Sequence, residues 1–531
     1  MALFQAYRSD LKINALDALP GALRGDVPLH NRASQGRPPR TPEDARLPLP
    51  EPATWPVTSA QLAAAYASKK TTPREVVVKA LDAARRLGGM TPSVGPLYRT
   101  TADVALEEAD RATARYRAGQ TLGPLDGVPY AVKEQTAVRG LPRQGGTAFL
   151  PDTPQPDDAT CIARLRAVGA IVIGSTPMTE YGMSPMGQNP NRTMPKNPHD
   201  PARLAGGSST GSGVAVATGL VPFAIGADGG GSIRIPSAMN GVFGIKPTWG
   251  RVSRAGDIST GTVAHLGPLA SSTADLARVL EVIGAPDALD AETSYAPVIE
   301  PGSLVRALGR GVRGLRIAVD DSEWADASDS VARAGREAMR ALEKEGAILV
   351  PVRLQLARHA PALGYLSIGL ETRTILRDEW ASNADAMGAD LQVTMGVLGE
   401  VGAVDYVDAQ RLRNGLRREL ADMFQDVDLL ALPSTVDTAA LASEREMASG
   451  FVDAKVLGNL CRFMFLANLT GLPASSSPVG LDASRLPIGF QLVGDAFDEA
   501  TVLAATAHLE RLGVARARRP RIAVDLLTAT L

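Results

Sequence analysis

The chain has 531 residues, a formal net charge of −2, 45% hydrophobic and 21% charged residues, which is typical of a globular protein and argues against nucleic acid as a partner. Two cysteines and five histidines without CxxC or HExxH spacing exclude a disulfide framework and argue against a metal site. The N-terminus does not resemble a signal peptide, and every apolar run is well below the roughly 18 residues that a membrane span needs. We therefore expect a cytoplasmic protein without a membrane span.

Residues 1–56 differ in composition from the rest of the chain. Prolines recur between residues 37 and 56, at positions Pro38, Pro39, Pro42, Pro48, Pro50, Pro52 and Pro56. Such a composition favours an extended linker over packed structure. We therefore predict an N-terminal extension over 1–56 and a folded domain over 57–531.

Two helices are expected at the start of this domain. Ser59 is a suitable N-cap for the first, in which Leu62 and Tyr66 follow helical spacing. Thr72 is a suitable N-cap for the second, with Pro73 at the first helical position. Both signals are local, and they predict where the helices begin.

From about residue 125 the pattern alternates between strands and helices. Strands are predicted over 128–133, 170–174, 221–227, 241–246, 315–320, 347–352, 427–433, 474–480 and 487–494. Helices are predicted over 158–170, after Gly211, over 273–284, and through most of a segment from about 355 to 425. We interpret 57–531 as one large α/β domain that carries a helical insert at 355–425.

The segment from Gly206 to Thr248 is rich in glycine and serine. Within it, three glycines separate Asp228 from Ser232, and such a run lets several backbone N–H groups converge beside one side chain. A serine at the end of this nest can attack a carbonyl group whose oxygen points into the nest. No phosphate-binding motif can be fitted to these glycines, although the segment alone is also compatible with a plain tight turn.

Lys133 ends the predicted strand 128–133. A charged lysine is costly to bury, and desolvation lowers its pKa from about 10.4 toward neutrality, where the free amine can act as a base. The alternative is a lysine at a strand end whose stem is buried and whose charge reaches solvent. Two serines and one lysine are sufficient for cleaving an amide without histidine.

Three motifs occur in a fixed order: GVPYAVKEQ, then GGSSTGS, then GADGGGSIRIPSAMNGVFGIKPTWGRVS. In this order they resemble the amidase signature family, and the resemblance extends from about residue 58 to 515. The form ADGGGSIR is similar to the fatty-acid-amide-hydrolase-like bacterial and plant members. The resemblance implies an α/β amidase-signature fold, with a large mixed β-sheet core flanked by helices on both faces.

The resemblance also implies roles for individual residues. Ser232 is the nucleophile, Ser208 is the bridging serine after a cis peptide bond, and Lys133 is the base. The relay supplies acid, base and nucleophile, so no cofactor is expected. The backbone N–H groups of Gly229, Gly230 and Gly231 are expected to form the oxyanion hole. Ser209, Asp228 and Arg234 are expected to support the site without reacting.

Substrate preference is expected to depend on a methionine-rich loop that contains Met183 and Gln188, and on the apolar run 463–466. If these residues line the site, acyl chains, aryl amides or carbamates are favoured over free glutamine, and activated esters are also accepted. Ordinary core packing explains the same residues equally well. Glu134 and Gln135 replace the usual Asp-Asn of the family, which leaves the specificity open.

Three alternatives remain. Ser209 fits a GxSxG nucleophile elbow, but an α/β-hydrolase needs a late histidine, and the candidate His508 lies in a regular helical pattern. The second alternative is the A subunit of a tRNA-linked amidotransferase, which usually has glutamine where this chain has Ile235. The third is a small urea- or allophanate-type hydrolase. A small-molecule amide is the expected ligand, and a homodimer is the oligomeric state that the resemblance suggests.

Overall fold

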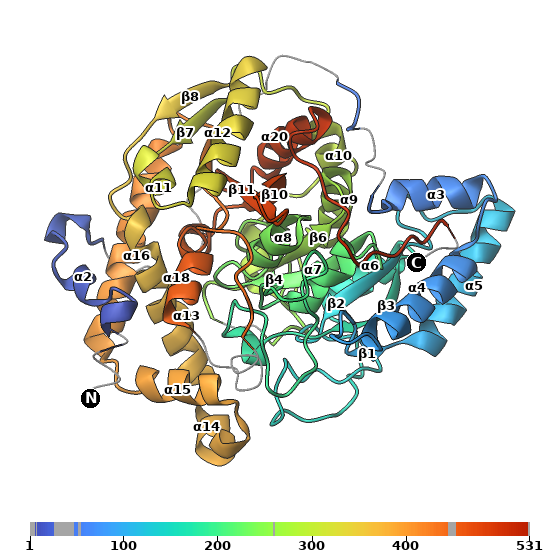
Figure 1. Ribbon diagram of the computed structural model, residues 1–531, viewed down its shortest axis with the longest axis horizontal. Coiled ribbons are helices and arrows are strands. Elements are labelled where there is room, and N and C mark those ends of the chain that lie inside the picture. Colours follow the sequence, from blue (N-terminus) through green and yellow to red (C-terminus); the bar gives the residue numbers. More distant parts are fainter. Residues whose placement is uncertain are drawn as a thin grey trace.

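The computed structural model describes residues 6, 8–25, 47–50, 55–258, 261–443 and 453–528. Its core is a single mixed sheet of 11 strands in the order β1-β3-β2-β4-β6-β5-β10-β11-β9-β7-β8, which Figure 1 shows crossing the molecule. Most of the prolines predicted to form a linker, Pro38, Pro39, Pro42 and Pro52, lie outside the described residues. The strands are β1 (Arg99–Thr100), β2 (Pro129–Lys133), β3 (Ile171–Thr176), β4 (Phe223–Asp228), β5 (Phe243–Lys246), β6 (His265–Ala270), β7 (Arg316–Val319), β8 (Ile348–Pro351), β9 (Leu429–Pro433), β10 (Ala474–Leu481) and β11 (Pro487–Gly494).

The centre of the sheet positions the two segments on which the sequence analysis focused. Strand β2 pairs in parallel with both β3 and β4, and all three strands are buried along their whole length. The carboxyl ends of parallel neighbours lie at the same edge of a sheet. Lys133, the last residue of β2, therefore lies beside the glycine loop that follows Asp228 at the end of β4.

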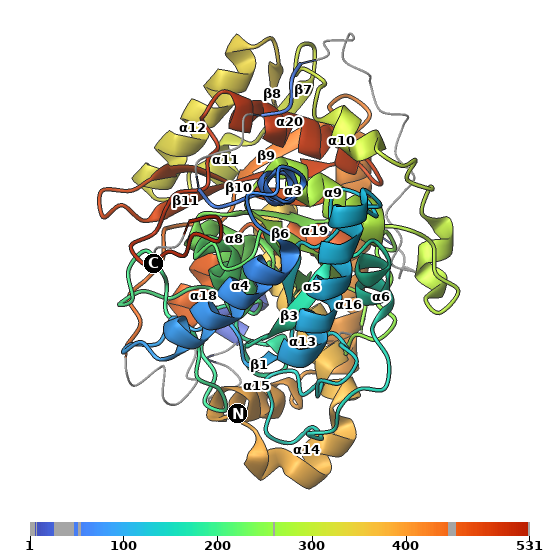
Figure 2. The ribbon, with the colours of Figure 1, turned by 90° about the vertical axis from the view of Figure 1, so that its right-hand side faces the viewer.

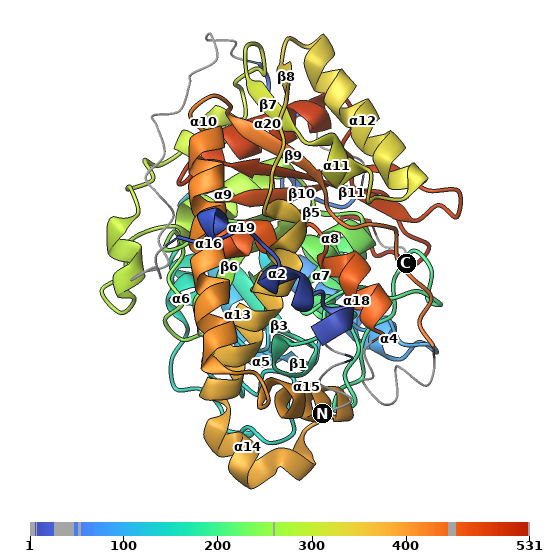
Figure 3. The same cartoon turned by 90° about the vertical axis from the view of Figure 1, so that its left-hand side faces the viewer.

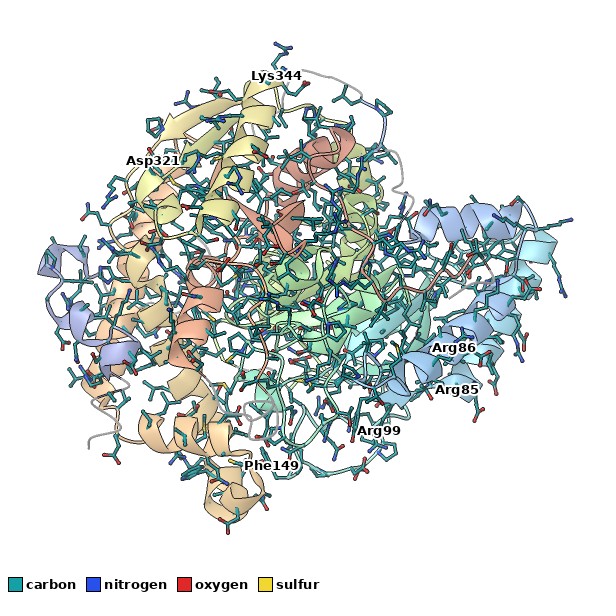
Figure 4. All side chains as sticks on the ribbon, viewed as in Figure 1. Arg85, Arg86, Arg99, Phe149, Asp321 and Lys344 are labelled. Carbon is teal, nitrogen blue, oxygen red and sulfur yellow. The ribbon has the colours of Figure 1, made fainter. Side chains whose placement is uncertain are left out.

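Helices cover both faces of the sheet, and the predicted α/β fold class is confirmed. Figure 2 shows α4 and α5 side by side in front of β3, and Figure 4 shows Arg85 and Arg86 of α4 at the periphery. The helices are α2 (Asn14–Asp17), α3 (Ser59–Ala67), α4 (Pro73–Gly88), α5 (Ala102–Ala118), α6 (Thr160–Ala167), α7 (Thr210–Ala217), α8 (Arg234–Asn240), α9 (Thr273–Ile283), α10 (Ser303–Ala307), α11 (Asp321–Trp324), α12 (Asp329–Lys344), α13 (Ala360–Ile375), α14 (Arg377–Asn383), α15 (Ala389–Leu398), α16 (Ala403–Met423), α18 (Ala454–Cys461), α19 (Phe465–Thr470) and α20 (Glu499–Arg511).

The segment 355–425, predicted to be mostly helical, contains α13 to α16, which lie between β8 and β9 in the chain. Helix α13 packs against α15, α16 and α19. The N-terminal residues 8–25 also pack here, because Ile13 and Leu16 are buried in the same apolar cluster as Leu412 and Leu416 of α16. Figure 3 shows α2 in front of α13 and α16. This part of the predicted extension is therefore attached to the helical insert.

The first two helices begin close to their predicted positions. Thr72 and Pro73 start α4 as predicted, and Glu75 completes a capping box with Thr72. In α3 the prediction was one residue late, because Thr58 is the N-cap and forms the capping box with Gln61. The hydroxyl of Ser59 instead donates to the buried carboxylate of Asp275.

The small residues of α7 allow the helix to approach the sheet closely, as predicted. A side chain at Gly211 would lie 2.8 Å from Thr176 Cβ at the end of β3, 2.5 Å from Pro177 Cδ and 2.8 Å from the carbonyl oxygen of Pro96. A side chain at Gly213 would lie 3.0 Å from the Asn240 amide. This close packing holds the start of α7, and with it Ser208, against the end of β2 and β3.

We predict that Gly211→Ala destabilises the protein by about 1–3 kcal/mol, because overpacking against backbone and a proline ring outweighs the higher helix propensity of alanine. The free energy of unfolding in urea measures this change. The matched control is Gly458→Ala in α18, where a methyl group meets no atom within 4 Å and is expected to stabilise the helix. Equal stabilisation by both substitutions would contradict the close packing of α7.

Candidate active site

Lys133 is buried at the end of β2 with only 1% of its surface exposed. Its Nζ donates hydrogen bonds to Ser208 Oγ at 2.7 Å and to the carbonyl oxygen of Ala227 at 3.5 Å. Burial lowers the pKa of Lys133 to about 7, although Asp257, Asp228 and Glu134 act in the opposite direction. A large fraction of this lysine is therefore uncharged at neutral pH.

Ser208 lies in the turn that leads into α7. The Gly207–Ser208 peptide bond is cis, as the resemblance implied, and the N–H of Gly207 donates to the carbonyl oxygen of Pro185 at 2.7 Å. The next residue, Ser209, is fully buried, and its hydroxyl donates to Ala227 O at 3.1 Å and accepts from Ala227 N at 3.3 Å. Ser209 thus fastens this turn to the end of β4.

Ser232 lies at the end of the glycine loop between β4 and α8 and is 8% exposed. Gly231 has a φ of 115°, which favours glycine, and its N–H donates to Asp228 Oδ1 at 2.7 Å. Among the described residues, no acceptor forms a hydrogen bond with the backbone N–H of Gly229 or Gly230. Of the three glycines expected to be oxyanion donors, only Gly229 and Gly230 thus offer an N–H without a protein acceptor.

The loop is held by a buried ion pair between Asp228 and Arg234, both completely inaccessible to solvent. Arg234 also donates to Met464 O at 3.0 Å, Gln491 Oε1 at 2.6 Å and Asn468 Oδ1 at 2.6 Å. Burial raises the pKa of Asp228, but the charge and hydrogen bonds of Arg234 outweigh this effect and hold it below its usual range. Asp228 and Arg234 therefore join both ends of the glycine loop to α19 and β11.

Two cavities meet at Ser232. We call the first the base-side cavity; it contains Lys133, Ser208 and Gly229. We call the second the apolar cavity; it begins at Gly230 and continues between α13, α15 and α18. Four residues line both cavities: Gly182, Met183, Ser232 and Ile368. A substrate bonded to Ser232 can thus extend into two separate spaces.

The substrate residues expected from the sequence are divided between cavity and core. Met183 lines both cavities, and Phe465 lines the apolar cavity. Gln188 lies outside both linings; it is 1% exposed, and its amide has no hydrogen-bond partner among the described residues. Met186 and Met194 are buried in the protein interior. In the methionine-rich loop, Met183 therefore lines the cavities, whereas Met186 and Met194 belong to the core.

The residues that follow Lys133 differ in their positions. Gln135 lines the base-side cavity and donates to Asp257 Oδ1 at 2.8 Å. Glu134 is buried in an ion pair with Arg192, with 3.3 Å between its Oε2 and Arg192 Nη2. Of the two departures from the family pattern, only Gln135 is placed to contact a substrate.

Sequence reasoning missed most of the wall of the apolar cavity. Tyr365 and Ile368 of α13, Val397 and Leu398 of α15, and Leu11 of the N-terminal segment all face it. These residues belong to no motif, and they are far in sequence from Lys133, Ser208 and Ser232. Helical periodicity predicts that such residues are buried, but it does not distinguish a cavity wall from ordinary core.

The nucleophile elbow interpretation lacks its histidine. The hydroxyl of Ser209 is engaged with the Ala227 backbone, and His508 lies within α20 as the sequence predicted. His508 Nδ1 is 3.0 Å from Arg511 Nη1, and its Nε2 is 3.6 Å from Glu345 Oε2. Ser209 and His508 thus have separate partners and do not form a Ser–His pair.

Comparisons with known proteins agree with this architecture. The family described as Amidase matches residues 80–503. The chain is 34% identical over 469 residues to the fatty acid amide hydrolase of Arabidopsis thaliana, which covers 87% of this chain and 77% of the relative. It is 36% identical over 464 residues to the A subunit of the glutamyl-tRNA(Gln) amidotransferase of Chloroflexus aurantiacus, covering 83% of this chain and 93% of the relative.

Solved structures give the same result. A vestigial protein complex linked to the origins of an s-triazine catabolic enzyme matches with a TM-score of 0.80 and 29% identity, covering 87% of this chain and all of the other. A crystal structure of an amidase matches with a TM-score of 0.71 and 28% identity, covering 86% and 99% of the two chains. The chain belongs to the amidase signature family. It is a hydrolase that acts on C–N bonds, and none of its described helices is long and apolar enough to cross a membrane.

We predict that Arg234→Gln lowers the free energy of unfolding by about 3–5 kcal/mol, because it leaves the Asp228 carboxylate buried without its charge partner. Urea unfolding of purified protein measures this loss. The control is Arg85→Gln on α4, where the side chain is 75% exposed and its ion pair with Asp82 contributes little. Equal midpoints for the two variants would show that Asp228 does not depend on Arg234.

Proposed function

We propose that the chain hydrolyses amides with apolar acyl or aryl groups through a relay of Lys133, Ser208 and Ser232. The observation that carries this proposal is the 2.7 Å contact between Lys133 Nζ and Ser208 Oγ in a cavity that Ser232 also lines. A lysine with a pKa of about 7 can accept a proton at neutral pH without a histidine.

The first half of the proposed reaction forms an acyl-enzyme. Ser208 gives its hydroxyl proton to the neutral amine of Lys133 and takes the proton of Ser232. The oxygen of Ser232 then bonds to the substrate carbonyl carbon. When the C–N bond breaks, the leaving nitrogen receives a proton from Lys133 through Ser208, and the electron pair of the broken bond stays on that nitrogen.

The second half is hydrolysis of the ester. A water molecule gives a proton to Lys133 through Ser208 while its oxygen bonds to the acyl carbon. The bond between Ser232 Oγ and that carbon then breaks, the proton returns through Ser208 to restore the hydroxyl of Ser232, and the carboxylic acid leaves. In both halves of the reaction the carbonyl oxygen becomes negatively charged. We propose that the N–H groups of Gly229, Gly230 and Ser232 stabilise this charge by donating hydrogen bonds to it. Fixed N–H donors that point to a developing oxyanion contribute most of the stabilisation in such sites. No cofactor enters either step.

The lining of the cavities supports an apolar substrate. Among the described residues that line them, Arg8 and Lys133 are the only charged ones, so a free amino acid would find no carboxylate for its ammonium group. Cavities of this composition bind hydrocarbon or aromatic groups, which lose contact with water when they enter. The relative from Arabidopsis thaliana, by its name, acts on fatty acid amides.

The alternative of an amidotransferase component is supported by the relative from Chloroflexus aurantiacus. At the position where such subunits usually have glutamine, Ile235 is fully buried and contacts the glycine loop, since a side chain at Gly231 would lie 2.7 Å from its Cδ1. Turnover by the isolated chain without ATP or tRNA distinguishes the two functions. Faster cleavage of small urea-type substrates would favour the third alternative.

We predict that kcat/KM rises with pH and inflects at about 7, because protonated Lys133 cannot accept a proton. On the acidic side the rate should fall about tenfold per pH unit, as expected for one titrating group. Steady-state rates on one nitroanilide measure the profile. In Lys133→Ala, a residual rate reduced about 100- to 10,000-fold should have no such inflection. An inflection that persists in this variant would assign the titration to another group.

We predict that Ser232→Ala abolishes amide turnover, because no other group replaces the attacking oxygen. Release of amine or ammonia is measured for wild type and Ser232→Ala with glutamine, acetamide, nitroanilides of short and long acids, and an aryl carbamate. More than about a tenth of the wild-type kcat, a loss below roughly 1.4 kcal/mol, would exclude Ser232 as the nucleophile.

The same panel tests the substrate class. We expect wild type to cleave the long-acyl nitroanilide or the aryl carbamate faster than glutamine or acetamide, because only the former fill the apolar cavity. Faster cleavage of glutamine would contradict the proposed substrate class while leaving the relay intact.

A further inference from the structure

We propose that residues 8–25, which we call the N-terminal strap, form part of the acyl-binding wall and set the preference for long acyl groups. This inference rests on the proposed function, because it concerns the apolar cavity at Ser232. Three residues of the strap, Arg8, Leu11 and Ile13, line that cavity together with Ser232 and Gly230. A segment about 220 residues away in the chain therefore completes the space in front of the proposed nucleophile.

The strap is fixed to α16 by polar contacts near both of its ends. Arg24 forms a bidentate ion pair with Asp408, with distances of 2.6 Å from Nε to Oδ1 and 2.8 Å from Nη2 to Oδ2. Arg8 Nη1 lies 3.2 Å from Asp405 Oδ1, and the N–H of Gly25 donates to Arg411 O at 2.9 Å. Bidentate pairing of arginine with a carboxylate fixes orientation as well as distance.

Apolar packing joins the strap to the same helix. Ile13 and Leu16 are 6% and 4% exposed, and Leu11, Leu19 and Leu23 pack against the cluster to which they belong. Burial of this many aliphatic side chains stabilises the attachment well beyond what the ion pairs contribute. The strap is therefore a packed part of the cavity wall.

Arg8 does not make this wall a site for acidic substrates. Its guanidinium donates to Asn14 Oδ1 at 2.9 Å, Asp17 Oδ2 at 3.3 Å and Asp405 Oδ1 at 3.2 Å. With its donors directed to these partners, Arg8 contributes its hydrocarbon stem to the cavity. The wall contributed by Arg8, Leu11 and Ile13 is therefore suited to methylene groups.

Helix α16 has a glycine, Gly415, beside Leu23 of the strap. A methyl group at Gly415 would overlap the carbonyl oxygen of Leu23. Gly415→Ala therefore displaces the strap without changing any residue that lines the apolar cavity. This offers a remote variant to compare with Leu11→Ser, which changes the wall directly.

The experiment measures KM and kcat for nitroanilides of a long-chain acid and a two-carbon acid, with full-length wild type, Leu11→Ser and Gly415→Ala. We expect both variants to raise KM for the long-chain substrate about tenfold, which corresponds to the loss of roughly two methylene contacts. The kcat/KM for the two-carbon substrate should stay within about twofold of wild type, because a short acyl group does not reach the strap.

The control is Gly88→Ala in α4, where a methyl group meets no atom within 4 Å, and it should change neither substrate. Equal effects of Leu11→Ser on both substrates, or no effect on either, would overturn the role of the strap. If Gly415→Ala loses both thermal stability and activity on both substrates, the variant is misfolded. The result for Leu11→Ser then decides alone whether the strap sets the acyl preference. A wild type that does not prefer the long-chain substrate would instead contradict the proposed function.

Discussion

The buried ion pair between Asp228 and Arg234 connects the parts of the protein that must meet at the proposed nucleophile. Asp228 ends β4, Arg234 begins α8, and the partners Asn468 and Gln491 come from α19 and β11. Two charges without solvent exposure are stable only if their hydrogen bonds are satisfied. The glycine loop between them is thus held by contacts that reach from β4 to β11 across the middle of the sheet, and not by the loop alone.

The position of Lys133 depends on a second constraint, the parallel pairing of β2 with β3 and β4. Burial of the whole strand removes water from the ammonium group, while its hydrogen bonds to Ser208 and Ala227 keep it in place. Because burial decreases its pKa more than the nearby carboxylates increase it, the lysine can exchange protons near neutral pH. Burial of β2 in the centre of the sheet is therefore also what lowers the pKa of Lys133.

The sequence predicted the strands that carry the site, because they are apolar runs that end at glycine or at a polar residue. It did not predict β6, whose Gly267 and Pro268 are unusual within a central strand. From motifs it predicted a site at Lys133, Ser208 and Ser232, which line one cavity, but it did not single out Asn468, which no local pattern distinguishes. The cavity walls could not be assigned, because their contacts join segments far apart in sequence.

The two cavities share the wall around Ser232 and differ in the parts that lie farther from it. Of the two, only the base-side cavity contains Lys133 and Ser208, and only the apolar cavity reaches α15, α18 and the N-terminal strap, whereas α13 and Ser232 contribute to both. Substitutions in these outer helices can reshape the space for a substrate without disturbing the buried network. In evolutionary terms, the outer part of the apolar cavity can change its shape while Lys133, Ser208 and Ser232 keep their positions.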